Sequence, residues 1–344
     1  MNYILNFSQI VINWFHFNGR KNLPWQINKN IYKTWISEIM LQQTQVEVVI
    51  PYFIKFIKKF PNIKKLSNSS LDEILFLWSG LGFYNRAKNI YKTSQIIKNK
   101  YKNIFPENFY NLIKLPGIGK STAGAILSLT FNYNFPILDG NVKRVLTRFY
   151  NLKFKKYKLE KILWNKLNIL NPIHNSQKFN QSMMDLGKII CTFKKKKCNI
   201  CPLKIKCLTY INKVIIKKKI KKKKIKKCWF IILKYKNFFY LKKQKNKIWN
   251  NLYYFPIFYK KSELFKWIKK KNFCLKNSKK LKKIIYHLNT YSLNIKSIII
   301  EIKKKKKKKK KKKNNKIWFN FNKQQKIGIP TVIKKIFYKI YKKY

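Results

Sequence analysis

The chain has 344 residues and is 46% hydrophobic, which is long enough for two domains with separate cores and too apolar for a disordered protein. Its formal net charge of +71 favours a nucleic-acid partner, but only four of the 81 basic residues are arginine, and lysine codons are A/T-rich, so the excess can equally record base composition. No apolar run reaches the roughly 18 residues of a membrane span, so we expect a cytoplasmic protein of bacterial type.

From the N-terminus to about residue 210, apolar positions recur with a helical period. Residues 1–17 lack the basic start of a signal peptide and predict a folded helix. Further helices are predicted over residues 31–59 with a break near Pro51, 71–77, 87–100, 121–129, 141–150 and 177–191. These elements predict an all-α domain over residues 1–212.

The composition changes after this helical region. Residues 213–227 are nearly all Lys and Ile, which predicts a linker. Short aromatic and β-branched runs then predict strands over residues 229–235, 238–242, 253–259, 297–302 and 317–321. We expect a smaller α+β domain over residues 228–344, in which the lysine run 303–313 forms a solvated, disordered loop.

Four of the six cysteines are crowded into one segment with the spacing C-x6-C-x2-C-x5-C, namely Cys191, Cys198, Cys201 and Cys207. Four thiolates this close can hold zinc or a cubane iron–sulfur cluster. Zinc ribbons usually carry two C-x2-C knuckles and this loop carries one, which favours the cluster. Residues 194–197 are lysines that could face phosphate or simply reflect the composition. Cys228 and Cys274 have no partner at a useful spacing.

The segment 115–120, Leu-Pro-Gly-Ile-Gly-Lys, lies between two predicted helices. Gly117 and Gly119 permit a tight turn whose backbone N–H groups, with Lys120 and Ser121 at the start of the next helix, can hold a phosphate. Glycine pairs often only make turns, but Pro116 and Ser121 reinforce the pattern.

Two carboxylates stand out in a chain that has only ten acidic residues. Glu38 lies among apolar residues on a predicted helix, where an ordinary Glu would be a solvated surface charge. Asp139 precedes a predicted helix, where helix capping is the simple alternative. Cleavage of a glycosidic bond needs an acid for the leaving group and a negative charge beside the cationic sugar. We expect Glu38, with its pKa raised by apolar surroundings, to be the acid and Asp139 the ionised stabiliser.

Several segments, in order and spacing, resemble the MutY family of adenine DNA glycosylases within the endonuclease III, or helix-hairpin-helix, superfamily. They are residues 23–26, 35–46, 80–84, 115–120, 135–148, 179–187 and the cysteine loop 191–207. The resemblance is strong over residues 10–210. It implies one 4Fe-4S cluster on the four cysteines, Asp139 in the active site, and excision of adenine opposite 8-oxoguanine or guanine after base flipping.

The resemblance also implies roles for further residues. Endonuclease III enzymes have a nucleophilic lysine where this chain has Ser121, so a glycosylase that does not cleave the strand is expected. Gln42 and Phe83 are expected to enter the base stack, or else to pack helices. The hairpin residues and Asn141 are expected to contact DNA. The partner is double-stranded DNA with A:8-oxoguanine or A:G mismatches, bound by a monomer.

Residues 228–344 resemble, more weakly, the family's Nudix-like domain that contacts 8-oxoguanine. Its recognition loop corresponds to residues 288–293, where Asn289 can still hydrogen-bond a base edge, whereas His287 is more typical of a structural histidine. Two other functions stay open. One is an endonuclease III-like lyase on oxidised pyrimidines, and the other is a non-catalytic basic DNA-binding protein.

Overall fold

The computed structural model describes residues 2–214, 223–244, 248–275, 278–303, 315–320, 322–323 and 325–341. The chain forms two compact units. The first comprises Met1–Ser69 and Lys88–Lys217, and the second comprises Ser70–Ala87 and Lys218–Tyr344. The segment 70–87 therefore packs with the C-terminal half of the chain, although it lies within the predicted helical domain. None of the helices in the described ranges is both long enough and apolar enough to cross a membrane.

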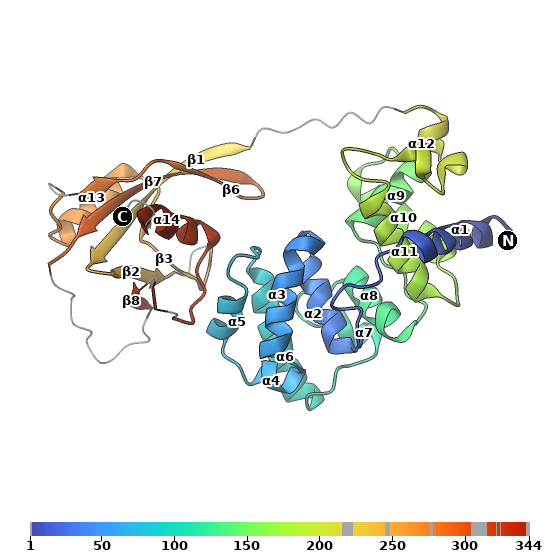
Figure 1. Ribbon diagram of the computed structural model, residues 1–344, viewed down its shortest axis with the longest axis horizontal. Coiled ribbons are helices and arrows are strands. Elements are labelled where there is room, and N and C mark those ends of the chain that lie inside the picture. Colours follow the sequence, from blue (N-terminus) through green and yellow to red (C-terminus); the bar gives the residue numbers. More distant parts are fainter. Residues whose placement is uncertain are drawn as a thin grey trace. The chain divides into compact units, whose positions relative to one another are not determined.

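The first unit is helical. Its elements are α1 Asn2–Asn18, α2 Ile31–Leu41, α3 Val46–Lys59, α4 Ile63–Ser67, most of α6 Asn85–Tyr101, α7 Phe109–Leu112, α8 Lys120–Phe131, α9 Gly140–Phe149, α10 Lys156–Leu170, α11 Ser176–Ile189 and α12 Leu208–Ile211. Figure 1 shows two groups of helices in this unit, one containing α1 and α9–α12 and the other containing α2, α3, α6 and α8. The predicted helical domain is confirmed, although α4, α7, α10 and α12 lie where no helix is predicted.

The group around α1 and α9–α11 has its own apolar core. On α1, Phe7 and Val11 lie one turn apart and are buried, and the Phe7 ring meets Phe149 of α9 edge to face at 4.9 Å. Met183 and Leu186 of α11 complete the same core. This packing fixes α9 and α11 relative to one another, which matters because both helices line the pocket described below.

The break predicted near Pro51 is wrong in position. Pro51 lies inside α3, and the chain instead leaves the helix at Gln42, where α2 ends, and turns through Gln43 with a φ of 58°. Pro51 is only the sixth residue of α3, so it removes one hydrogen bond near the start of the helix, and packing of Val49, Phe53 and Phe56 retains the rest. The corner at residues 42–45 is what brings Gln42 to the hairpin.

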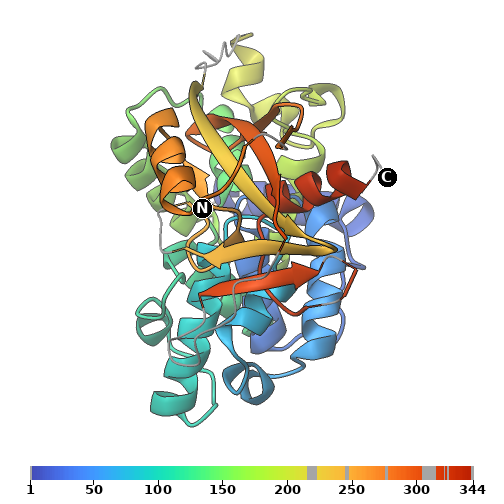
Figure 2. The ribbon, with the colours of Figure 1, turned by 90° about the vertical axis from the view of Figure 1, so that its left-hand side faces the viewer.

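The second unit is a sheet with helices. Its elements are α5 Leu71–Leu77, β1 Lys224–Tyr235, β2 Phe238–Lys243, β3 Tyr253–Tyr254, β4 Ile257–Phe258, α13 Lys261–Lys270, β5 Lys279–Lys280, β6 Ile284–His287, β7 Tyr291–Glu301, β8 Lys316–Asn320 and α14 Thr331–Tyr341. In the described part, eight strands form one mixed sheet, with β1 parallel to β7 and antiparallel to β2. An α+β second domain is thus confirmed. Figure 2 shows β1 and β7 side by side.

The two faces of this sheet carry different helices. Ile231 and Leu233 of β1 pack with α13, whereas Phe230, which points to the opposite face, contacts Phe255, and Phe255 in turn contacts Phe337 of α14. Alternate residues of β1 therefore supply two separate apolar layers.

The strand β1 begins at Lys224, inside the segment 213–227 that the sequence predicts as a linker. Its first residues are exposed lysine and isoleucine, and they are held by the parallel pairing of Lys224 with Tyr291 through Lys234 with Glu301. Backbone hydrogen bonds to a strand far away in the sequence do not depend on the side chains of residues 224–227, so the local composition does not predict them. Residues 215–222 of the linker and 304–314, most of the lysine run, lie outside the described residues.

Candidate active site

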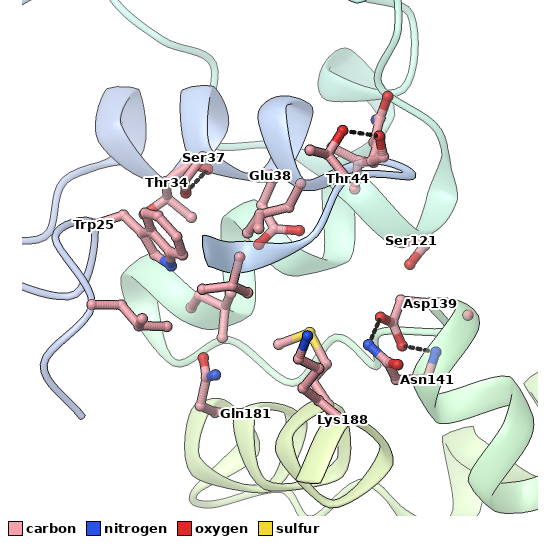
Figure 3. Close-up of a pocket in the computed structure, with 18 of the residues that line it drawn as sticks. Trp25, Thr34, Ser37, Glu38, Thr44, Ser121, Asp139, Asn141, Gln181 and Lys188 are labelled. Carbon is pink, nitrogen blue, oxygen red and sulfur yellow. Dashed lines mark hydrogen bonds between the residues drawn. The ribbon is translucent and has the colours of Figure 1, made fainter. Parts of the chain in front are cut away.

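A pocket of about 640 Å³ lies in the first unit and is lined by five of the predicted site residues, Glu38, Gln42, Ser121, Asp139 and Asn141. Its walls come from α2 and the corner that follows it, from the starts of α8 and α9, and from α11. Figure 3 shows Glu38 facing the pocket from α2, Asp139 and Asn141 at the start of α9, and Gln181 and Lys188 on α11. The volume is within the roughly 300–1,000 Å³ typical of small-molecule sites.

Glu38 is set in the middle of α2, between the buried residues Ser37 and Ile39. Burial raises the pKa of Glu38 to about 7, and the nearby negative charge of Asp139 adds to the increase. A carboxyl group with this pKa holds a proton in a large fraction of molecules at neutral pH. Glu38 can therefore donate a proton to a group inside the pocket.

Asp139 is the N-cap of α9, so the helix-capping role considered from the sequence is present. Asp139 also lines the pocket. Its Oδ1 accepts hydrogen bonds from the backbone N–H groups of Asn141 (2.9 Å) and Val142 (2.7 Å), and its Oδ2 accepts one from Asn141 Nδ2 (3.0 Å). Burial raises the pKa of Asp139, while these hydrogen bonds and Arg144 act in the opposite direction. The carboxylate is thus held in one orientation at the positive end of a helix.

Asn141 connects Asp139 to a neighbouring arginine. Its Oδ1 accepts a hydrogen bond from Arg144 Nη2 (2.8 Å), and Arg144 Nε donates to the carbonyl oxygen of Cys191 (2.7 Å). Arg148, one turn further along α9, donates to Cys191 Sγ (3.3 Å) and to the carbonyl oxygen of Thr192 (2.7 Å). The helix that carries Asp139 is therefore bonded to the start of the cysteine loop.

The hairpin forms a tight turn that leads into α8. Gly117 adopts a φ of 84°, which favours glycine, and a Cβ there would lie 2.8 Å from Asn89 Nδ2. Gly119 is the N-cap of α8 and supplies no side-chain cap, so the first N–H groups of this helix are available to a ligand. Gln42 Nε2 donates to the carbonyl oxygen of Gly117 and to Thr122 Oγ1, both at 3.3 Å.

Known proteins share this architecture. The family described as HhH-GPD superfamily base excision DNA repair protein matches residues 36–168. An adenine DNA glycosylase from Buchnera aphidicola subsp. Acyrthosiphon pisum (strain APS) is 52% identical over 337 residues, which cover 96% of each chain. This chain belongs to the adenine DNA glycosylase family.

Solved structures agree at the level of the fold. A thermostable thymine-DNA glycosylase superposes with a TM-score of 0.56 at 26% identity and covers 61% of this chain and 97% of its own. A non-covalent endonuclease III–DNA complex gives 0.53 at 22% identity and covers 62% and 97%. The match is therefore to the helical glycosylase fold.

The four cysteines of this adenine DNA glycosylase family member line a second pocket, of about 350 Å³. Burial raises the pKa of Cys201 to about 11, and the charges of the other three add to the increase, so the four sulfurs lie near one another. In the described residues, no group of three or more His, Cys, Asp or Glu side chains is placed to hold a single metal ion. A tetrahedral zinc ion needs all four sulfurs about 2.3 Å from one centre, whereas a cubane spreads them over four irons. Four thiolates that line one pocket suit a soft-metal centre.

The remaining predicted site residues belong to different parts of the molecule. Ser121 lines the active-site pocket, while Lys120 directs its ammonium group over the Trp164 ring at 4.2 Å. Phe83 lies in the segment that packs with the second unit and is 38% exposed. Asn289 is exposed in the turn between β6 and β7, and His287 Nδ1 lies 2.8 Å from Ser292 Oγ, which suits a structural histidine.

Several residues that line the pocket or hold its walls were not singled out from the sequence. Arg20 bonds the fully buried Asp185 through its backbone N–H (2.7 Å) and Nε (3.0 Å). Asn180 holds the segment before Asp139 by accepting a hydrogen bond from the Ile137 N–H at 3.0 Å. One signal was present. In a lysine-rich chain the arginines mark places that need several donors, and Arg20, Arg144 and Arg148 each donate through two side-chain nitrogens here.

Proposed function

We propose that this chain excises adenine mispaired with 8-oxoguanine or guanine in double-stranded DNA. The observation that carries the proposal is the placement of Glu38 and Asp139 in one pocket of a member of the adenine DNA glycosylase family. The adenine would be flipped out of the duplex into this pocket, at a cost of a few kcal/mol of stacking.

The two carboxyl groups have complementary tasks in this reaction. Glu38, which retains a proton near neutral pH, protonates the leaving adenine as the bond from the sugar to the base breaks. Asp139, held by hydrogen bonds at the start of α9, stabilises the positive charge that develops on the sugar. A water molecule then adds to the sugar carbon and gives up a proton to the Glu38 carboxylate, which leaves adenine, an abasic site and Glu38 protonated again.

The strand itself is expected to stay intact. Cleavage through a Schiff base needs an amine nucleophile, and Ser121 occupies the position that a lysine holds in endonuclease III enzymes. Lys120, its neighbour, is engaged with the ring of Trp164. Both observations favour a monofunctional glycosylase over the lyase alternative.

We propose one 4Fe-4S cluster on Cys191, Cys198, Cys201 and Cys207. When bound, it would cross-link the cysteine loop and add to the stability of the fold. Arg148, which donates to Cys191 Sγ, would offset part of the negative charge of the thiolates. Purified protein should absorb visible light near 400 nm and contain iron. A colourless preparation containing zinc would contradict the proposal.

The C-terminal unit is proposed to be the Nudix-like domain of the family. Its mixed sheet with a helix on each face supports this proposal, and Asn289 at the exposed β6–β7 turn is the proposed contact to the opposing base. The protein would act as a monomer on duplex DNA, with the hairpin 115–120 on the phosphate backbone.

The test is excision from four duplexes that carry A opposite 8-oxoguanine, A opposite guanine, A opposite thymine, or thymine glycol. Excision from the first two only is expected, and cleavage of thymine glycol would overturn the proposal. Glu38→Gln should abolish base release while leaving duplex affinity nearly unchanged, because the amide cannot donate the required proton. Retained turnover in this variant would remove Glu38 from its role.

A further inference from the structure

The segment 70–87 carries Phe83 and is built into the C-terminal unit. At the start of α5, Asp72 pairs with Lys243 of β2 at 2.6 Å. Further along α5, Leu75 lies against Gly328, where an added Cβ would come within 2.7 Å of Leu75 Cβ. The close approach at Gly328 requires a glycine, so this contact is specific rather than incidental.

The loop that follows α5 is bonded to residues just before and within α14. Ser79 Oγ accepts a hydrogen bond from the Ile329 N–H (3.1 Å), and the Tyr84 hydroxyl donates to the Ile329 carbonyl oxygen (3.2 Å). Lys334 Nζ donates to the Ser79 carbonyl oxygen (2.8 Å). Both backbone groups of the buried Ile329 are therefore used to hold the two ends of the loop 79–84.

Phe83 itself has an unfavourable backbone conformation. Its φ is 48°, in the left-handed region that a bulky residue rarely adopts. The loop is braced from inside by Trp78 Nε1 and Arg86 Nη2, which donate to the Gly82 carbonyl oxygen at 3.0 and 3.2 Å, and the Arg86 guanidinium lies 5.2 Å from the Phe83 ring. Such strain persists only where the surroundings hold it in place.

We propose that Tyr84, Ile329 and Lys334 are positioning residues for Phe83, so that the C-terminal unit takes part in opening the base pair. The inference rests on the proposed function and on the expectation from the sequence that Phe83 enters the base stack as adenine leaves it. Displacing stacked bases costs free energy. A loop without contacts to the rest of the unit would change its own conformation before the bases unstack. Bonds from Ile329 and Lys334 supply that support from a part of the chain about 250 residues away.

The test uses Tyr84→Phe and Lys334→Met, singly and combined. Tyr84→Phe deletes one oxygen and with it the bond to Ile329 and the bond from the Gly80 N–H within the loop, and Lys334→Met removes the donor to Ser79. Exposed Tyr157→Phe on α10 and Lys335→Met beside Lys334 are the matched controls. Each protein is mixed with a duplex carrying 2-aminopurine next to A opposite 8-oxoguanine. The fluorescence change on unstacking and the single-turnover excision rate are measured.

The double variant is expected to lose most of the fluorescence change and to excise adenine about tenfold more slowly, since each lost bond weakens the support. Its duplex affinity should stay within about threefold of wild type. Lys334→Arg, which keeps a donor at this position, should restore the fluorescence change that Lys334→Met reduces. Because the two variants differ in this donor, their comparison also separates positioning from misfolding. An unchanged fluorescence signal and rate in the double variant would overturn the inference. If the wild-type protein gives the fluorescence change but excises no adenine, the proposed function is overturned and this inference still stands.

Discussion

Glu38 and Asp139 are both carboxyl groups, but their surroundings give them different properties. Glu38 lies within a helix among buried residues, and burial together with the charge of Asp139 raises its pKa to about 7. Asp139 accepts hydrogen bonds from two backbone N–H groups at a helix start, which oppose the effect of burial on its pKa. The difference suits one group to hold a proton and the other to remain charged.

We expect the rate of adenine excision to fall as the pH rises through about 7. The pKa of Glu38 is raised above its ordinary value of 4.5, so the protonated form is abundant below pH 7 and is lost above it. The expected slope is about tenfold per pH unit on the alkaline side. Single-turnover rates between pH 5.5 and 9 at constant ionic strength will measure it. A rate that rises through pH 7 would contradict the assignment of Glu38 as the acid.

Arg144 is expected to tolerate no replacement by lysine. Its guanidinium donates at once to Cys191 and to Asn141, which in turn holds Asp139, and a lysine cannot make both contacts. Arg144→Lys should lower the single-turnover excision rate by about 10- to 100-fold, as removal of an orienting partner typically does. Lys143→Met, which breaks only the surface pair with Glu160, is the control and should keep its rate. Equal rates for both variants would show that Arg144 does not orient Asp139.

The helices α9 and α11 approach closely, and this contact places Asp139 and Gln181 in the same pocket. A Cβ on Gly187 of α11 would lie 2.7 Å from Asn141 Cβ and 3.0 Å from the Asn141 carbonyl carbon. Because the Asn141 side chain bonds Asp139, a shift of α9 at this point moves the carboxylate.

Gly187→Ala should therefore destabilise the fold by about 1–3 kcal/mol and also slow excision. Urea unfolding followed by circular dichroism will measure the change. Gly140→Ala is the stability control, since a Cβ at Gly140 of α9 meets nothing within 4 Å. If the two variants unfold at the same urea concentration, the close contact contributes little to stability.

The contribution of the molecule's positive charge to DNA binding is best tested by measuring how the affinity depends on salt concentration. Lysines that contact phosphate release counterions, whereas lysines that record only base composition do not change the salt dependence of binding. Replacing exposed Lys194, Lys195 and Lys197 of the cysteine loop by Gln should flatten the plot of log affinity against log salt by up to about three units. The same change at exposed residues 269–271, at the end of α13, should leave the slope unchanged. If both triple variants give equal slopes, the loop lysines do not contact phosphate and reflect only base composition.

The sequence alone determined the features that depend on neighbours along the chain. The helical first domain, the α+β second domain and the helix start at Asp139 could be predicted and are confirmed. The roles of the four cysteines, the hairpin and the two carboxylates stay predictions. Helical period, glycine turns and ligand spacing are local properties that a linear pattern records. The position of the break between α2 and α3 was missed because packing around Val49 and Phe53 outweighs the local effect of Pro51.

Only the tertiary structure decided which distant residues meet. It assigned residues 70–87 to the C-terminal unit, began β1 at Lys224 by pairing it with β7, and joined Asp139 to Cys191 through Asn141 and Arg144. Each of these depends on hydrogen bonds or close contacts between residues about 50 to 250 positions apart, and their energies do not appear in any local pattern of residues.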